Sequence, residues 1–250
     1  MSSLHISLSA EPLFNLHGFT VTNSILTTWI VTGFLILISL YLNRTLKTQG
    51  KISGLQLLFE FIIEGLHDLT ETIAGSRKTR VFFPFVATFF IFIIVSNWSG
   101  ILPGVGSIGV IKNVHGETEF VPIFRAPTAD INTTLALGFI SMVLVQYFGV
   151  KYLKLSYFKK FLNFNSFIDF FVGILELISD IAKVISFAFR LFGNIFAGEV
   201  LLAVIGYLLP LANSPFLGME VFVGFIQALV FAMLSLVFFS MATDSHSHES

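Results

Sequence analysis

The sequence predicts an all-α, polytopic membrane protein with about five membrane-embedded helices, organised as a single domain over residues 1–250. Two observations lead to this class. The chain is 55% hydrophobic and only 12% charged, about half the charge of a soluble domain. Its mean hydropathy is +0.87, and several apolar stretches reach the ~20 residues that a membrane span needs. The fold class follows from composition before any motif is considered.

Composition also excludes several functions. The chain has no cysteine, so disulfides and thiolate metal sites are excluded. Its net charge is −1. That charge gives no reason to expect a nucleic-acid partner. We predict no cofactor and no metal. The motif at 104–109 spells GxGxxG, but it follows a membrane helix rather than a strand, so a dinucleotide site is not expected.

The first elements alternate between polar segments and apolar runs. Residues 1–17 are polar and lack the basic region of a signal peptide. The N-terminal segment 1–23 is expected outside the membrane. The run 24–42 is the first span. Residues 53–74 show an apolar face opposite several carboxylates, which predicts an amphipathic interfacial helix, although an ordinary helix on the soluble side fits equally well. The runs 82–102 and 131–150 are the next two spans.

The last two helices differ from the others. The run 167–208 is too long for one perpendicular span. It also carries six charged residues: Asp169, Glu176, Asp180, Lys183, Arg190 and Glu199. A turn-rich stretch at 213–215 separates it from the final run, 216–241. We therefore predict a long hairpin that is steeply tilted or nearly parallel to the membrane.

Positive residues set the orientation. They gather in two loops, one over 44–80 and the other over 151–160. The positive-inside rule assigns both loops to the cytoplasmic side. With five crossings, the N-terminus lies outside and the C-terminus in the cytoplasm.

Arg190 lies in one of the most apolar parts of the chain. Arginine keeps its charge, because its pKa stays above ~12 in proteins, and it costs roughly 2.5–3.5 kcal/mol at the centre of a membrane helix. At 100° per residue, four polar residues fall within about 40° of it: Glu176, Lys183, Ser186 and Asn194. Glu199 falls on the opposite side. Arg190 is therefore predicted to lie at the centre of a polar stripe.

Folding the hairpin back gives a register between the two helices. In an antiparallel pair, residues whose numbers share a sum lie level. Arg190 then lies level with Gln227, and Glu199 with Glu220. The orientation places Glu199 and Glu220 toward the outside and Glu176 toward the inside, so Arg190 separates two groups of carboxylates. Such groups mark proton relays, with the cation as a barrier to leakage. Ion pairs that merely hold the bundle together are the alternative.

Five segments resemble subunit a of the F-type ATP synthase. The most specific is Arg190-Leu-Phe-Gly-Asn194-Ile-Phe-Ala-Gly-Glu199. The match continues in Gln227-Ala-Leu-Val-Phe231 with the tail at 240–243, and in two segments at 83–103 and 127–134. Together they cover most of the chain from about residue 80 onward, while the first 80 residues match only in layout.

The resemblance implies roles for these residues. Arg190 would face a ring of c subunits that each carry a carboxyl group. Glu199, Glu220, Asn194 and Gln227 would line an outer half-channel, with Asp130 and Asn132 at its entrance. Glu176 would line the inner half-channel. From the helical wheel and the orientation, we also place Asp169 and Asp180 there.

The same resemblance implies the partners and the setting. The partners would be the c-ring, the b subunits of the peripheral stalk, the remaining subunits of the complex and the lipid bilayer. The chain would translocate protons without being catalytic alone, and the layout suggests a bacterial inner membrane. Two other classes compete. A stand-alone secondary transporter predicts internal repeats, and an intramembrane enzyme predicts a GxSxG or HExxH motif. The sequence shows none of these.

Overall fold

The computed structural model describes residues 9–16, 18–46, 54–102, 104–114, 117–154, 157, 161, 167–209 and 213–244. Five helices dominate it, and each is long and apolar enough to cross a membrane. They are α1 (Asn23–Thr45), α2 (Gly54–Ser99), α3 (Ile131–Leu153), α4 (Phe167–Leu208) and α5 (Asn213–Thr243). The predicted class, a helical multi-pass membrane protein, is confirmed.

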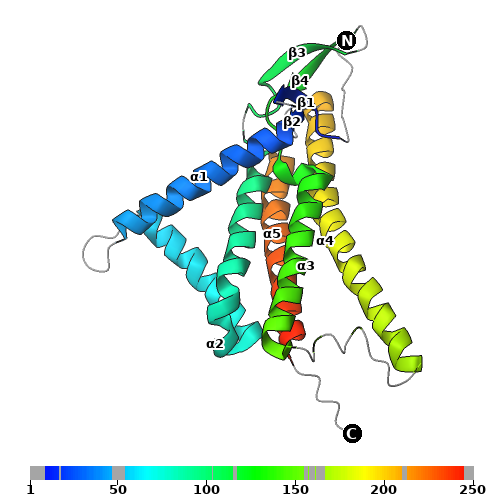
Figure 1. Ribbon diagram of the computed structural model, residues 1–250. Helices are drawn as coiled ribbons and strands as arrows, with labels where there is room; N and C mark the ends of the chain where they lie inside the picture. The colour runs from blue at the N-terminus through cyan, green and yellow to red at the C-terminus, as the bar shows by residue number, and fades with distance from the viewer. Residues whose placement is uncertain are drawn as a thin grey trace.

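Two short antiparallel hairpins were not predicted. Strands β1 (Pro12–Leu16) and β2 (Phe19–Thr22) form one, and β3 (Gly109–Val114) and β4 (Glu117–Pro122) form the other. Both lie at the same end of the helical bundle (Figure 1). A short 3-10 helix, η1 (Pro127–Ala129), leads from β4 into α3. The GxGxxG stretch runs through turns into β3 and does not open a helix.

Three helices run side by side through the centre of the bundle. The second half of α2 contacts α5, and α3 contacts α4 and α5. Phe82, Phe148 and Phe239 are fully buried where α2, α3 and α5 meet, with ring centroids 4.9 to 5.7 Å apart. Tilted ring pairs of this kind add to the stabilisation from burial. Helix α4 crosses the bundle at an incline, while α1 leans away from it (Figure 1).

Helix α2 corrects two predicted boundaries. The predicted interfacial helix 53–74 and the predicted span 82–102 are two arms of α2, separated by a kink at Gly75. Residues 76–81, which were left between the two elements, are helical, and the helix ends at Ser99 rather than at 102. The physical reason is Gly75, whose φ of 74° and ψ of 154° lie in a region that essentially only glycine occupies. One residue makes the bend, so no loop is needed.

A buried asparagine ties three elements together at the hairpin end of the bundle. Asn97, on α2, donates through Nδ2 to the Gly224 carbonyl of α5 at 2.8 Å. Its Oδ1 accepts from the Thr128 hydroxyl of η1 at 2.6 Å. Both groups are buried, where an unmade hydrogen bond costs about 1–3 kcal/mol. These bonds fix η1, and with it the start of α3, against α2 and α5.

Candidate functional site

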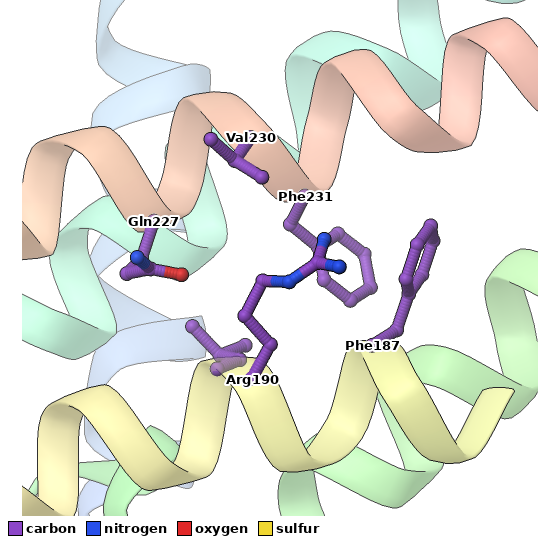
Figure 2. Close-up of a pocket in the computed structure, with 6 residues that line it drawn as sticks. Phe187, Arg190, Gln227, Val230 and Phe231 are labelled. Atoms are coloured by element: carbon purple, nitrogen blue, oxygen red, sulfur yellow. The ribbon is translucent and has the colours of Figure 1, made fainter. Parts of the chain in front are cut away.

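Arg190 of α4 and Gln227 of α5 line one small pocket. Four apolar residues complete its lining: Phe187, Leu191, Val230 and Phe231. Figure 2 shows the arginine and the glutamine reaching into the space between the two helices. The register that places these two residues level is confirmed.

The Arg190 guanidinium is not neutralised by the chain itself. Within the described residues, no ion pair or hydrogen bond reaches its guanidinium nitrogens. The hydrogen bond from Asn194 Nδ2, at 3.0 Å, goes to the backbone carbonyl of Arg190 and not to its side chain. Arg190, Asn194 and Ser186 are all exposed. This part of the predicted stripe therefore presents a permanent charge on the outer surface of the single chain.

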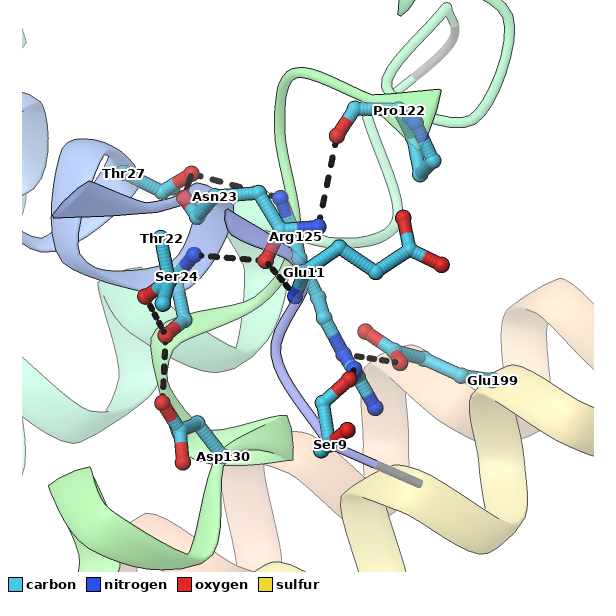
Figure 3. Close-up of polar contacts among 10 residues, drawn as sticks. All are labelled: Ser9, Glu11, Thr22, Asn23, Ser24, Thr27, Pro122, Arg125, Asp130 and Glu199. Carbon is cyan, nitrogen blue, oxygen red and sulfur yellow. Dashed lines mark hydrogen bonds and ion pairs between the residues drawn. The ribbon is translucent and has the colours of Figure 1, made fainter. Parts of the chain in front are cut away.

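Glu199 meets a cation that the sequence reasoning missed. Arg125, in the segment between β4 and η1, approaches it with Nε 3.6 Å from Glu199 Oε2. The Glu199 side chain retains 29% of its exposure, whereas Arg125 is only 9% exposed. Figure 3 shows the pair lying beside Ser9 of the N-terminal segment. Like Arg190, Arg125 is a cation in an apolar stretch, and this could have marked it as a candidate site residue. Its partner could not be predicted, because Glu199 lies 74 positions away in the sequence.

Glu220 lies across the α4–α5 interface, one residue from level with Glu199. It is 6% exposed and packs against Gly198, where an added Cβ would overlap the Glu220 carboxyl group. The predicted level of the two glutamates is therefore confirmed to within one residue. Across the described ranges, Glu220 makes no hydrogen bond or ion pair.

Asp130 begins α3 rather than standing open to water. Its carboxylate accepts from the Asn132 backbone N–H at 2.9 Å and from Asn132 Nδ2 at 3.1 Å. It also accepts from the Ser24 hydroxyl of α1, and it is 4% exposed. This is the geometry of an N-cap. Asn132 itself is exposed on the surface of the single chain, whereas Asp130 is buried.

The carboxylates in the first half of α4 differ in their surroundings. Asp180 is 4% exposed, and it accepts from Lys183 Nζ at 2.7 Å and from Gln146 Nε2 of α3 at 3.1 Å. Gln146 Oε1 in turn accepts from the Tyr157 hydroxyl at 2.8 Å. Lys183, predicted to share the face of Arg190, thus pairs with Asp180. Glu176 and Asp169 are half-buried.

Tyr157 closes this network from the connection between α3 and α4. Its ring is 2% exposed and covers Gly149, which has no Cβ to obstruct it. Burial first, and then the nearby charges of Asp180 and Glu176, raise the pKa of Tyr157 to about 12. The phenol therefore remains a proton donor to Gln146 at neutral pH.

Comparison with known proteins bears on the whole chain. The family described as ATP synthase A chain matches residues 25–240. A relative is the chloroplastic ATP synthase subunit a of Stigeoclonium helveticum, 36% identical over 244 residues that cover 96% of this chain and 93% of the relative. The matched region contains all five helices apart from two residues at the start of α1 and three at the end of α5. The chain belongs to the ATP synthase A chain family.

Proposed function

We propose that this chain is the stator subunit that translocates protons past a ring of c subunits, through two offset half-channels separated by Arg190. One observation carries the proposal. The Arg190 guanidinium is exposed and has no carboxylate partner within the described residues, although it lies between carboxylates on both sides along α4. A permanent cation without an internal partner fits a carboxylate supplied by another subunit.

The spacing along α4 supports two separate paths. Glu199 lies nine residues beyond Arg190 and Glu176 fourteen residues before it. At 1.5 Å per residue these are about 13 Å and 21 Å along the helix axis. Neither distance allows direct proton transfer across the arginine. A proton must therefore leave one path, travel on the ring and enter the other.

The physics of the ring carboxyl group gives the motion its direction. A carboxyl group facing lipid stays neutral, because a bare charge there is costly. Beside Arg190 its ionised form is favoured and it releases its proton. It must collect another proton before it returns to lipid. Each proton that crosses contributes roughly 2.3 kcal/mol per 100 mV of membrane potential.

We assign the remaining polar residues to the two paths. Glu199, Glu220, Asn194 and Gln227 line the outer half-channel. Asp130 and Asn132 lie at its entrance, where Asp130 holds the start of α3 and Asn132 is exposed. Glu176 lines the inner half-channel. Asp169 lies on the same side of Arg190 along α4, and Asp180 contributes there through its network with Lys183.

We propose the orientation from the same residues. The basic loops over 44–80 and 151–160 face the cytoplasm, which leaves the N-terminus outside. The b subunits of a peripheral stalk and the remaining subunits of the complex complete the assembly, and nucleotide chemistry belongs to those other subunits. The bacterial inner membrane stays a prediction, because the relative named above is a chloroplast protein.

The test is the assembled complex carrying Arg190→Ala, reconstituted in vesicles and assayed for ATP-driven proton pumping and for passive leak. We expect pumping to be lost and a passive leak to appear, with assembly unchanged. Ser186→Ala is the matched control, because Ser186 is exposed on the same face of α4 but carries no charge; it should pump normally. Normal pumping by Arg190→Ala would overturn the proposed mechanism.

A further inference from the structure

Arg125 is held by three segments that are far apart in the sequence: the N-terminal segment, α1 and α4. Its Nη1 donates to the Ser9 carbonyl at 2.9 Å, and its backbone N–H donates to the Thr27 hydroxyl of α1 at 3.3 Å. From α4, the Phe196 ring lies 5.7 Å from its guanidinium carbon, and Glu199 Oε2 lies 3.6 Å from its Nε. Figure 3 shows the arginine extending from the loop toward Glu199. The side chain is thus fixed before any proton arrives.

We propose that Arg125 is a positioning residue of the outer half-channel, which orients Glu199 and favours the ionised form that can accept a proton. The inference rests on the proposed function above. In this proposal, Arg125 sets the pH range in which the outer half-channel conducts protons. Arg125 lies outside the Arg190–Glu199 segment that resembles the family.

The need for such a cation follows from the surroundings of Glu199. A carboxylate among apolar side chains favours its neutral form, and a relay that stays protonated cannot accept the next proton. A fixed guanidinium nearby favours the ionised form. The geometry is loose as well, because 3.6 Å exceeds the 2.7–2.9 Å of a tight charge-assisted hydrogen bond. Arg125 therefore biases Glu199 without locking it, which a proton carrier requires.

Few other charges act on Glu199. Glu220 of α5 is the carboxylate across the interface, where it packs against Gly198. From α2, Glu199 meets Gly100, where an added Cβ would lie 3.4 Å from Glu199 Oε1. The N-terminal segment contributes Glu11, whose backbone N–H donates to Asn23, and Asp130 is engaged by Ser24 and Asn132. Within the described residues, Arg125 is thus the cation that reaches Glu199.

The experiment measures passive proton conduction through the membrane sector of the assembled complex, stripped of its nucleotide-binding sector, in vesicles with a potassium diffusion potential. The pH on the outer side is varied. In Arg125→Gln, Glu199 loses its counter-charge, so conduction that needs ionised Glu199 should require a higher pH. We expect the midpoint of the conduction curve to move upward by about one pH unit, a typical size for a carboxylate that loses an adjacent arginine.

Two further variants separate charge from structure. Arg125→Lys keeps the charge and should restore the wild-type midpoint. Thr27→Val removes the hydroxyl that holds the same loop but leaves the charge in place, so its midpoint should match the wild type even if stability falls. Arg125→Met replaces the glutamine variant if the latter does not assemble.

Each outcome decides the matter. An assembled Arg125→Gln or Arg125→Met complex with the wild-type midpoint would overturn the proposal, and so would a Thr27→Val curve that shifts equally. Failure of both neutral variants to assemble would make Arg125 a structural residue and also overturn it. The proposed function falls separately, through normal pumping by Arg190→Ala or through a wild-type membrane sector that does not conduct.

Discussion

The carboxyl group of Glu220 lies directly against the Cα of Gly198, across the interface between α5 and α4. An added Cβ at position 198 would overlap the Glu220 carboxyl group, and both residues are buried. The glycine leaves room for the carboxyl group, so the position of Glu220 depends on the absence of a side chain at this point of the facing helix. This contact lies next to the Arg125–Glu199 pair, toward the end of the bundle that carries the two β-hairpins (Figure 1).

Gly198→Ala should therefore displace Glu220 or push α4 and α5 apart. Overpacking of this kind typically costs about 1–3 kcal/mol of folding free energy. We expect a loss of thermal stability of the detergent-solubilised complex and a fall in ATP-driven proton pumping. Gly218→Ala is the matched control, because an added Cβ there meets nothing within 4 Å. Equal behaviour of the two variants would show that Glu220 does not depend on this contact.

Asp180→Asn and Lys183→Met should each destabilise the chain, because each leaves one partner of the ion pair without its counter-charge. Removing one partner of a buried pair costs about 3–5 kcal/mol, and the lower end applies here because the Lys183 side chain is 27% exposed. Unfolding in mixed micelles would measure both losses. The double variant Asp180→Leu/Lys183→Met should recover most of the stability.

The same variants test the inner path. If the double variant is stable and still pumps protons, Asp180 holds α4 against α3 and does not carry protons. If it is stable and does not pump, Asp180 belongs to the inner half-channel. The Tyr157–Gln146–Asp180 chain of hydrogen bonds makes this distinction worth measuring, because such a chain suits either role.

The contribution of Tyr157 to stability should depend on pH. Its folded pKa of about 12 exceeds the ordinary value of 10, so the unfolded chain loses the phenolic proton first as pH rises. The contribution is fully present below pH 10 and is lost between about pH 10 and 12. Comparing unfolding of wild type and Tyr157→Phe at pH 8 and pH 11 would reveal it, since the difference should shrink at the higher pH. Tyr147→Phe, at an exposed position, should show no such trend.

The sequence predicted the parts of the site that follow from helical geometry. Arg190 with Gln227, and Glu199 with Glu220, come together because antiparallel helices with the same rise per residue keep a constant sum of residue numbers. Counting therefore located these contacts without knowledge of the tilt. The Lys183–Asp180 pair is an i,i+3 contact within α4 that helix spacing could also have located. The contact of Asp180 with Gln146 could not be counted, because it depends on how α3 packs against α4.

Contacts made by loop residues could not be predicted from helix spacing. Arg125 meets Glu199 only because the segment after β4 folds over α4, and no periodicity relates the two. The two hairpins were missed because short strands outside the spans carry little pattern beside the long apolar runs. Asp130, by contrast, could have been identified from the sequence, since an aspartate directly before a helix is a frequent N-cap.

The bend at Gly75 divides α2 into two arms that point in different directions (Figure 1). Its 54–74 arm extends sideways from the bundle, while its 76–99 arm stands among α3 and α5 (Figure 1). A single glycine joins the two arms, where a flexible loop would let them swing independently. The angle between the central bundle and this side arm is therefore set at one residue, so a substitution at Gly75 would redirect the whole 54–74 arm.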